Sequence, residues 1–507
     1  MSKNLAGKTV SGVKWSTAST IINAVLQLGY GAIMARLLDP EEFGLVAMMH
    51  VVLRFVDYFA KMGMGHAIIQ KKELSDKEIR AGFTSSFLLG IISMFFVYAL
   101  APYVTLLFDN ERLVSVVRFS SILFLIQGIS ITAVGLLTRD LKFKVLAIIN
   151  LISFIIGYLF IGIYMAYSGY GVYSLISALI SQVLINGIIS YMYARHSLIF
   201  IFKKKYYASL LSYGSKISLI SFLDFINLSL DKILIEKFLG TSQLGFYDRA
   251  SQIVYLPLYY LSNSISKVML PSFSKIQDDI IKLGKIYKEI ISVLSAMLFP
   301  SCVYIILFAE DIVMLLLGEG WEKSIPVLQI ISIAVSLRMI TMFAGIICDA
   351  TANLKARMIN NIAQMISLCV SFYFLSHLGL EGFAYSIVIS QIINLIAFIL
   401  TMNKILQIRI LSLVYLYKPA LKISIFTMVL LSIIKYLSTL INVPFVIDFF
   451  LSSVLSLLII CSLILIFPPK ELVYRLINTI DKKDIILYKI SIKKYQMQYL
   501  MFLKKKI

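Results

Sequence analysis

The sequence predicts an all-α, polytopic membrane protein with about fourteen transmembrane helices. The 507 residues are 59% hydrophobic and have a mean hydropathy of +0.89, and a soluble chain of this size could not cover so much apolar surface. Apolar runs of about 20 residues, the length that crosses a bilayer, fill most of the chain. Backbone groups in lipid must be hydrogen-bonded internally, and the alternating pattern of a membrane barrel is absent, so the spans are expected to be helices.

The apolar runs place the spans in a definite order along the chain. They are residues 12–35, 43–64, 82–107, 113–137, 145–167, 171–194, 214–236, 244–267, 289–309, 325–350, 358–377, 382–403, 417–438 and 445–467.

Charge placement favours an even number of spans with both termini in the cytoplasm. With the N-terminus inside, lysine and arginine gather in the inner loops and the acids in the outer loops, as the positive-inside rule requires. The cations that remain outside are Arg36, Arg112, Lys237, Lys323 and Lys435. The net charge of +20 therefore reflects topology and attraction to anionic inner-leaflet lipids, and no nucleic acid is expected as a partner.

A weak internal repeat connects the two halves of the chain. The segment Ala35–Leu45 returns as Glu236–Phe246, and Gly44 matches Gly245. Both copies join two apolar runs, so each is expected to form a tight corner between helices at the outer surface. Pro40 suits the first turn of the second helix, and the two matching glycines would allow helices to approach closely.

The repeat divides the chain into four parts. We expect an N-terminal lobe (1–205), a C-terminal lobe (206–410), two additional transmembrane helices (411–468) and a basic cytoplasmic tail (469–507). Each lobe would hold six helices, so the two pseudo-symmetric lobes would share one orientation and be related by an axis along the membrane normal. The tail is either an amphipathic helix on the inner leaflet or a partly disordered segment.

Short motifs in both halves are typical of one class of transporter. They are Ser11–Trp15, Ala35–Leu45, Gly63–Gln70, Leu230–Lys232, Gly245–Ala250, Pro271–Asp278 and Leu317–Trp321. They resemble those of Wzx-type polysaccharide and O-antigen flippases, in the branch of the multidrug/oligosaccharidyl-lipid/polysaccharide exporter superfamily that includes colanic-acid and teichuronic-acid exporters. The resemblance covers roughly residues 8–410, and the last hundred residues or so match little.

The resemblance implies two lobes that rock about a central cavity in the bacterial cytoplasmic (inner) membrane. The cargo would be a polyprenyl-pyrophosphate-linked oligosaccharide repeat unit, moved from the inner to the outer leaflet for surface polysaccharide such as lipopolysaccharide O-antigen. A polysaccharide polymerase and glycosyltransferases would be partners. The alternatives are an ion-coupled drug or metabolite antiporter of the same superfamily and, less favoured, a membrane-embedded polymerase or ligase.

The sequence contains no catalytic set, phosphate loop or metal-ligand cluster, so no enzyme activity, cofactor or metal is expected. Polar side chains inside spans are costly and usually face a cavity or a partner. Tyrosine and amide faces suit sugars, and cations suit a pyrophosphate. The candidate cargo-binding residues are Arg54, Arg338, Lys61, Lys232, Arg249, Asn23, Gln27, Gln252, Tyr255 and Tyr259.

Arg54 and Arg338 are predicted near mid-membrane, one in each lobe, and function is favoured for them. For Asp248 and Arg249 a structural ion pair is favoured. Candidate acids for coupling to a proton or sodium gradient also lie in spans. They are Asp57, Asp224 and Asp231, together with the amide of Asn227. The alternative for each acid is neutralisation of a nearby arginine or lysine.

Overall fold

The computed structural model describes most of the chain. The described residues are 2–61, 75–106, 108, 110–202, 225, 229–274, 276–351, 353–441 and 444–467. The predicted coupling residues Asp224 and Asn227 and the basic tail lie outside these ranges. For Lys61 and Tyr259 the helix is described but the side chain is not.

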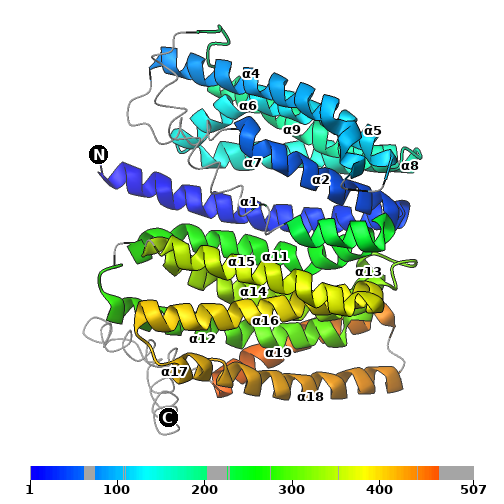
Figure 1. Ribbon diagram of the computed structural model, residues 1–507, viewed down its shortest axis with the longest axis vertical. Coiled ribbons are helices and arrows are strands. Elements are labelled where there is room, and N and C mark those ends of the chain that lie inside the picture. Colours follow the sequence, from blue (N-terminus) through cyan, green and yellow to red (C-terminus); the bar gives the residue numbers. More distant parts are fainter. Residues whose placement is uncertain are drawn as a thin grey trace. The chain divides into compact units, whose positions relative to one another are not determined.

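Every regular element among the described residues is a helix (Figure 1). Within the described residues, ten helical segments are long and apolar enough to cross a membrane. One of these, 354–406, holds two helices, α15 (Leu354–Leu375) and α16 (Gly379–Leu406). The predicted all-α, polytopic fold class is therefore confirmed, while spans such as 214–236 fall largely outside the described residues.

The chain forms two compact units, which are described separately. Unit 1 comprises Met1–Tyr260 and Val313–Val327, and unit 2 comprises Leu261–Ile312 and Leu328–Ile507. The chain thus leaves unit 2 after residue 312, joins unit 1 for a short stretch, and returns. The division into lobes 1–205 and 206–410 stays a prediction.

Unit 1 begins with two helices joined by the predicted corner. The helices described in this unit are α1 (Ser2–Leu37), α2 (Pro40–Lys61), α4 (Asp76–Leu100), η1 (Ala101–Leu106), α5 (Arg112–Ser120), α6 (Ile122–Arg139), α7 (Phe143–Phe154), η2 (Ile155–Gly162), α8 (Ile163–Tyr167), α9 (Val172–Ala194), a helical stretch over residues 229–239 and the first part of α11 (Thr241–Ser274). The span predicted over 113–137 is divided between α5 and α6 at Ser121.

Small residues allow the helices of unit 1 to pack at backbone distance. Helix α6 packs against both α4 and α9. A Cβ atom added to Gly90 of α4 would lie 2.6 Å from the carbonyl oxygen of Phe124, and one added to Gly128 of α6 would lie 2.5 Å from that of Ser86. Such contacts between small residues hold helices together where lipid supplies little hydrophobic driving force.

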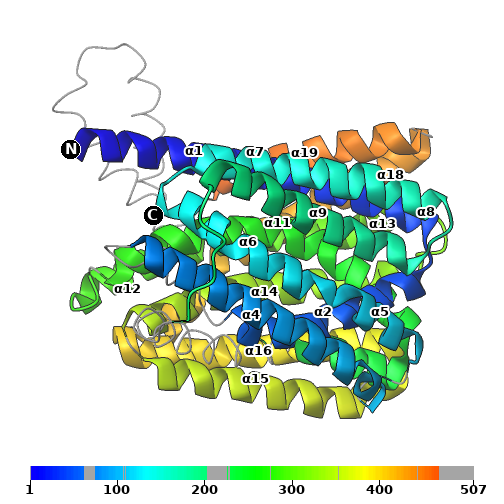
Figure 2. The ribbon, with the colours of Figure 1, turned by 90° about the horizontal axis from the view of Figure 1, so that it is seen from above.

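Unit 2 contains the two helices that follow the repeat. The helices described in it are the second part of α11 (from Leu261), α12 (Ile280–Leu307), the start of α13 (Ala309–Leu316), most of α14 (Ser324–Ala350), α15, η4 (Ser376–Leu378), α16, α17 (Ile410–Tyr415), α18 (Lys418–Ile441) and α19 (Phe445–Ile466). Helices α15 and α16 run side by side (Figure 2). Helices α12, α18 and α19 share a buried cluster of Ala296, Ile423 and Leu463, so the two additional helices are an integral part of this unit.

Candidate functional site

The two copies of the repeated corner meet within unit 1. A Cβ atom added to Gly44 would lie 2.1 Å from the carbonyl oxygen of Thr241, and one added to Gly245 would lie 1.8 Å from that of Pro40. Pro40 and Thr241 occupy matching positions of the repeat, so the contact is reciprocal. The N-terminal ends of α2 and α11 therefore cross with no room for a side chain on either glycine, and the predicted close approach is confirmed.

The segment of residues 313–327, here called the strap, packs on this corner. The Arg36 guanidinium at the end of α1 donates hydrogen bonds to the carbonyl oxygens of Leu315 (2.6 Å) and Leu316 (3.3 Å). These carbonyls belong to the last turn of α13, where backbone acceptors have no partner inside the helix. Arg36 therefore caps a helix of the strap and fixes it on the first corner.

Trp321 is the buried centre of the strap. Its indole nitrogen donates to the carbonyl oxygen of Ala35 at 2.9 Å. Its ring makes edge contacts with Phe43 at 5.4 Å and Phe246 at 5.7 Å between centroids, and the residue is only 1% exposed. One side chain thus contacts both copies of the corner.

The neighbouring loop of the strap is held by local bonds. Gly320 has a positive φ of 85°, which favours glycine, and its amide donates to the Glu322 carboxylate at 3.0 Å. The pKa of Glu322 lies below its ordinary value because the carboxylate accepts hydrogen bonds from its own backbone amide and from that of Gly320. Ser324 then donates to the carbonyl oxygen of Phe246 at 3.0 Å.

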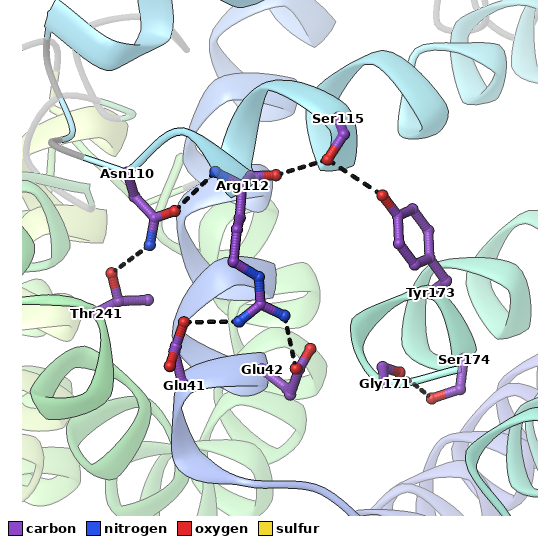
Figure 3. Close-up of polar contacts among 9 residues, drawn as sticks. All are labelled: Glu41, Glu42, Asn110, Arg112, Ser115, Gly171, Tyr173, Ser174 and Thr241. Carbon is purple, nitrogen blue, oxygen red and sulfur yellow. Dashed lines mark hydrogen bonds and ion pairs between the residues drawn. The ribbon is translucent and has the colours of Figure 1, made fainter. Parts of the chain in front are cut away.

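A polar network surrounds the N-terminal ends of α2, α5 and α11 (Figure 3). Arg112 bridges two acids of the first corner, Glu41 at 2.7 Å and Glu42 at 2.8 Å. Asn110 accepts a hydrogen bond from the Arg112 amide and donates to the Thr241 hydroxyl, both at 2.9 Å. The network therefore connects the start of α5 with both copies of the corner.

A cluster of charges lies deeper in unit 1. The Asp248 carboxylate accepts from Lys232 at 2.5 Å, from Arg249 at 2.8 Å and from Gln252 at 3.0 Å. Its side chain is 4% exposed, against 12% for Arg249 and 25% for Lys232. We call Lys232, Asp248, Arg249 and Gln252 the cationic cluster. Arg249 is the ninth residue of α11, which places it roughly 12 Å along the helix from its N-terminal residue Thr241 at 1.5 Å per residue.

Residues of α1 and α2 surround the cationic cluster. The Arg249 guanidinium lies over the ring of Phe43, 4.4 Å from its centroid, and it interacts electrostatically with Tyr30 of α1. His50 of α2 lies within electrostatic range of Arg54, Lys232, Asp248 and Arg249. The side chains in and around this cluster therefore come from α1, α2, α11 and the helical stretch 229–239 that carries Lys232.

The other predicted site residues have varied environments. The Asn23 side-chain amide donates hydrogen bonds within its own helix, to the carbonyl oxygen of Ser19 at 2.9 Å and to the Ser19 hydroxyl at 3.2 Å. Arg54 is exposed, whereas Gln27, Tyr255, Asp57 and Arg338 are half-buried. Arg54 belongs to unit 1 and Arg338 to unit 2.

Asp231 is not part of the cationic cluster, although it precedes Lys232. Its carboxylate accepts from the Tyr247 hydroxyl at 2.6 Å and from the Lys232 backbone amide at 2.8 Å. The structural ion pair expected between Asp248 and Arg249 is present, and sequence reasoning missed that Lys232 joins it.

The motifs already contained the signals for these contacts. The motifs Leu230–Lys232 and Gly245–Ala250 contain two charged dipeptides, Asp231-Lys232 and Asp248-Arg249, but the sequence does not indicate which acid pairs with which cation. The motif Leu317–Trp321 contains Gly318 and Gly320, whose positive φ angles mark the turns that bring Trp321 to the corner.

Comparison with known proteins gives the family. Residues 33–326 match the polysaccharide biosynthesis protein family. A membrane protein of the cps region of Klebsiella pneumoniae is 27% identical over 395 residues, covering 76% of this chain and 80% of that one. The lipopolysaccharide biosynthesis protein WzxC of Escherichia coli K12 is 26% identical over 351 residues, covering 66% of this chain and 69% of that one.

The fold is also found in a solved structure. The lipid II flippase MurJ, in an inward closed conformation, matches with a TM-score of 0.68 and 15% identity, covering 88% of this chain and 97% of that one. The family match and the similarity to WzxC confirm the resemblance to Wzx-type exporters, which are transporters and not enzymes. The chain belongs to the polysaccharide biosynthesis protein family, as a multi-pass, Wzx-like exporter protein.

Proposed function

We propose that this protein is a flippase for polyprenyl-pyrophosphate-linked oligosaccharide repeat units. It moves them from the inner to the outer leaflet of the bacterial cytoplasmic membrane by alternating access, and both of its termini lie in the cytoplasm. The family supports export in polysaccharide biosynthesis, and the remaining details are our proposal. A polymerase and glycosyltransferases are the proposed partners, since they would consume and supply the repeat units.

The observation that carries this proposal is the cationic cluster inside a membrane helix bundle. A pyrophosphate brings negative charge into a low-dielectric region, where cations are needed to offset its desolvation. Lys232 and Arg249 are held side by side on one carboxylate, and His50 lies within electrostatic range both of these residues and of Arg54. Arginine binds phosphate oxygens through two parallel hydrogen bonds, and lysine adds a point charge.

The remaining predicted residues have proposed roles in the same cycle. Gln252, Tyr255 and Tyr259 follow one face of α11 and would contact the sugar, with Asn23 and Gln27 of α1. Lys61 and Arg338 would supply further positive charge. Asp57, Asp224, Asn227 and Asp231 are the proposed sites of proton or sodium coupling, because carboxyl groups in a site that opens and closes change their affinity for a cation. The lobes 1–205 and 206–410 are the proposed moving parts.

Deletion of the gene tests the proposed function. Without export, polyprenyl-linked repeat units should accumulate on the inner leaflet while glycan synthesis continues, and the surface polysaccharide should be lost. Lipid extraction with mass spectrometry and surface glycan staining measure both effects, and the wild-type gene on a plasmid is the control. An unchanged surface glycan together with lost drug resistance would instead indicate an antiporter.

A further inference from the structure

We propose that Asp248 is a built-in counter-ion that competes with the pyrophosphate of the cargo for Lys232 and Arg249. This inference rests on the proposed function, because it concerns the same cationic cluster and the same substrate. It makes Asp248 a positioning residue, which holds the two cations ready and limits how tightly they retain the cargo.

The contacts show that one carboxylate serves both cations. Oδ1 of Asp248 accepts from Lys232, and Oδ2 accepts from Arg249 and from Gln252. Asp231, the adjacent acid, is bonded instead to the Tyr247 hydroxyl and to a backbone amide. Both oxygens of Asp248 are therefore occupied by groups that are themselves candidate ligands for the cargo.

His50 lies next to this group of charges and is influenced by several of them. The charges that act on His50 are those of Arg54, Lys232 and Arg249, against the single carboxylate of Asp248. Nε of Arg249 is buried and has no hydrogen-bond partner among the described residues. The cluster therefore retains an unused donor, which an additional anion would satisfy.

The chemistry of the two anions explains the competition. Carboxylate and phosphate oxygens accept from the same lysine and guanidinium donors, so an incoming pyrophosphate displaces Asp248 from at least part of its contacts. When the cargo leaves, Asp248 recovers them, and two largely buried cations are never left unpaired, which would be costly. No covalent bond changes and no proton has to move in this exchange.

Binding to the full-length protein in nanodiscs tests the proposal. The probe is labelled polyprenyl pyrophosphate, and uncharged polyprenol is the reference. Asp248→Asn keeps the size and one acceptor oxygen of the side chain but removes the competing charge. We expect its dissociation constant for the pyrophosphate to fall about tenfold, with a correspondingly slower release of bound probe after a chase and a loss of export in cells.

Two further comparisons separate competition from a structural role. Asp140→Asn is the matched control, since it removes an acid that pairs with a different lysine, Lys142, at 3.5 Å, and its affinity should change by less than about threefold. If the Asp248→Asn protein does not insert into the membrane, a double variant replaces it. The double variant Lys232→Met/Asp248→Asn has the net charge of the wild type, and it should bind the probe more tightly than Lys232→Met alone because it lacks the competing carboxylate.

The outcomes distinguish this inference from the function on which it rests. Wild-type protein that prefers pyrophosphate to polyprenol, with unchanged or weaker binding by Asp248→Asn, would overturn the counter-ion role alone. Wild-type protein that binds both probes equally would overturn pyrophosphate recognition, and with it the inference.

Discussion

Three of the cations that the sequence predicts on the outer side of the membrane have structural partners, which would account for their exception to the positive-inside rule. Arg36 caps the last turn of α13, and Arg112 pairs with Glu41 and Glu42. Lys435 donates to the carbonyl oxygen of Leu307 at 2.7 Å. These side chains fix the ends of helices, whereas the deeper cations Lys232 and Arg249 are gathered around one acid.

Arg54 and Arg338, the two arginines expected near mid-membrane, are predicted to be essential for export. Arg54→Ala and Arg338→Ala should each reduce surface polysaccharide at least about a hundredfold, since a buried phosphate loses several kcal/mol without its cation. Normal protein amounts in the membrane fraction would show that insertion is intact. Lysine at either position should restore export only in part, because it lacks the second hydrogen bond of a guanidinium. Full export by both alanine variants would show that neither arginine is needed for transport.

Trp321 is predicted to be a principal source of stability in the strap. Trp321→Ala should lower the free energy of unfolding by about 3 kcal/mol, because the ring is buried between Phe43 and Phe246 and its N–H is bonded. Thermal unfolding in detergent measures the change. The matched control is Trp15→Ala, since Trp15 is 40% exposed and its loss should cost much less. Equal shifts for the two variants would contradict the role given to the strap.

At the scale of elements, the crossing of α2 and α11 depends on the two repeated glycines. Each glycine faces a backbone carbonyl of the other corner, and backbone moves less readily than a side chain. Trp321 then covers this crossing from the strap. The N-terminal ends of two helices from opposite copies of the repeat are thereby held in one fixed geometry.

Alanine at either glycine is predicted to destabilise this crossing. Gly44→Ala or Gly245→Ala should lower stability by about 1–3 kcal/mol, because the added Cβ would lie 2.1 Å or 1.8 Å from a backbone oxygen. Gly29→Ala is the control, since a Cβ at Gly29 meets nothing within 4 Å and alanine favours a helix over glycine by roughly 0.5–1 kcal/mol. The melting temperatures of the purified variants measure these changes in stability. A Gly44→Ala protein as stable as Gly29→Ala would show that the helices do not cross so closely.

The fold followed from the sequence where the signal was local. The apolar runs predicted the helices, and Pro40 indicated the start of α2. Gly44 and Gly245 were expected to bring helices together, and they do. The burial of Trp321 could not be foreseen, because its partner Ala35 lies 286 residues away and hydropathy carries no information about such contacts. The pairing of Lys232 with Asp248 likewise depends on the packing of two helices, which the charges alone do not specify.

For the whole molecule, the topology is a prediction with a direct test. Single cysteines at Glu111 and Glu319, in a background without native cysteine, should react with an impermeant maleimide from outside intact cells. Cysteines at Asp76 and Lys285 should react only after the membrane is permeabilised. All four positions are exposed in the structure, so a difference in labelling reflects the side of the membrane. External labelling at position 285 would contradict an N-terminus in the cytoplasm.

Transport by purified protein in liposomes tests the central claim most directly. A polyprenyl-pyrophosphate-linked oligosaccharide is incorporated in both leaflets, and a membrane-impermeant glycosidase is added outside. Liposomes that contain the wild-type protein should expose almost all of the oligosaccharide to the enzyme, because molecules of the inner leaflet are brought across. Liposomes with the Arg54→Ala variant should expose only about half, the share of the outer leaflet. Exposure of only that half by the wild-type protein, with the variant no different, would contradict the account.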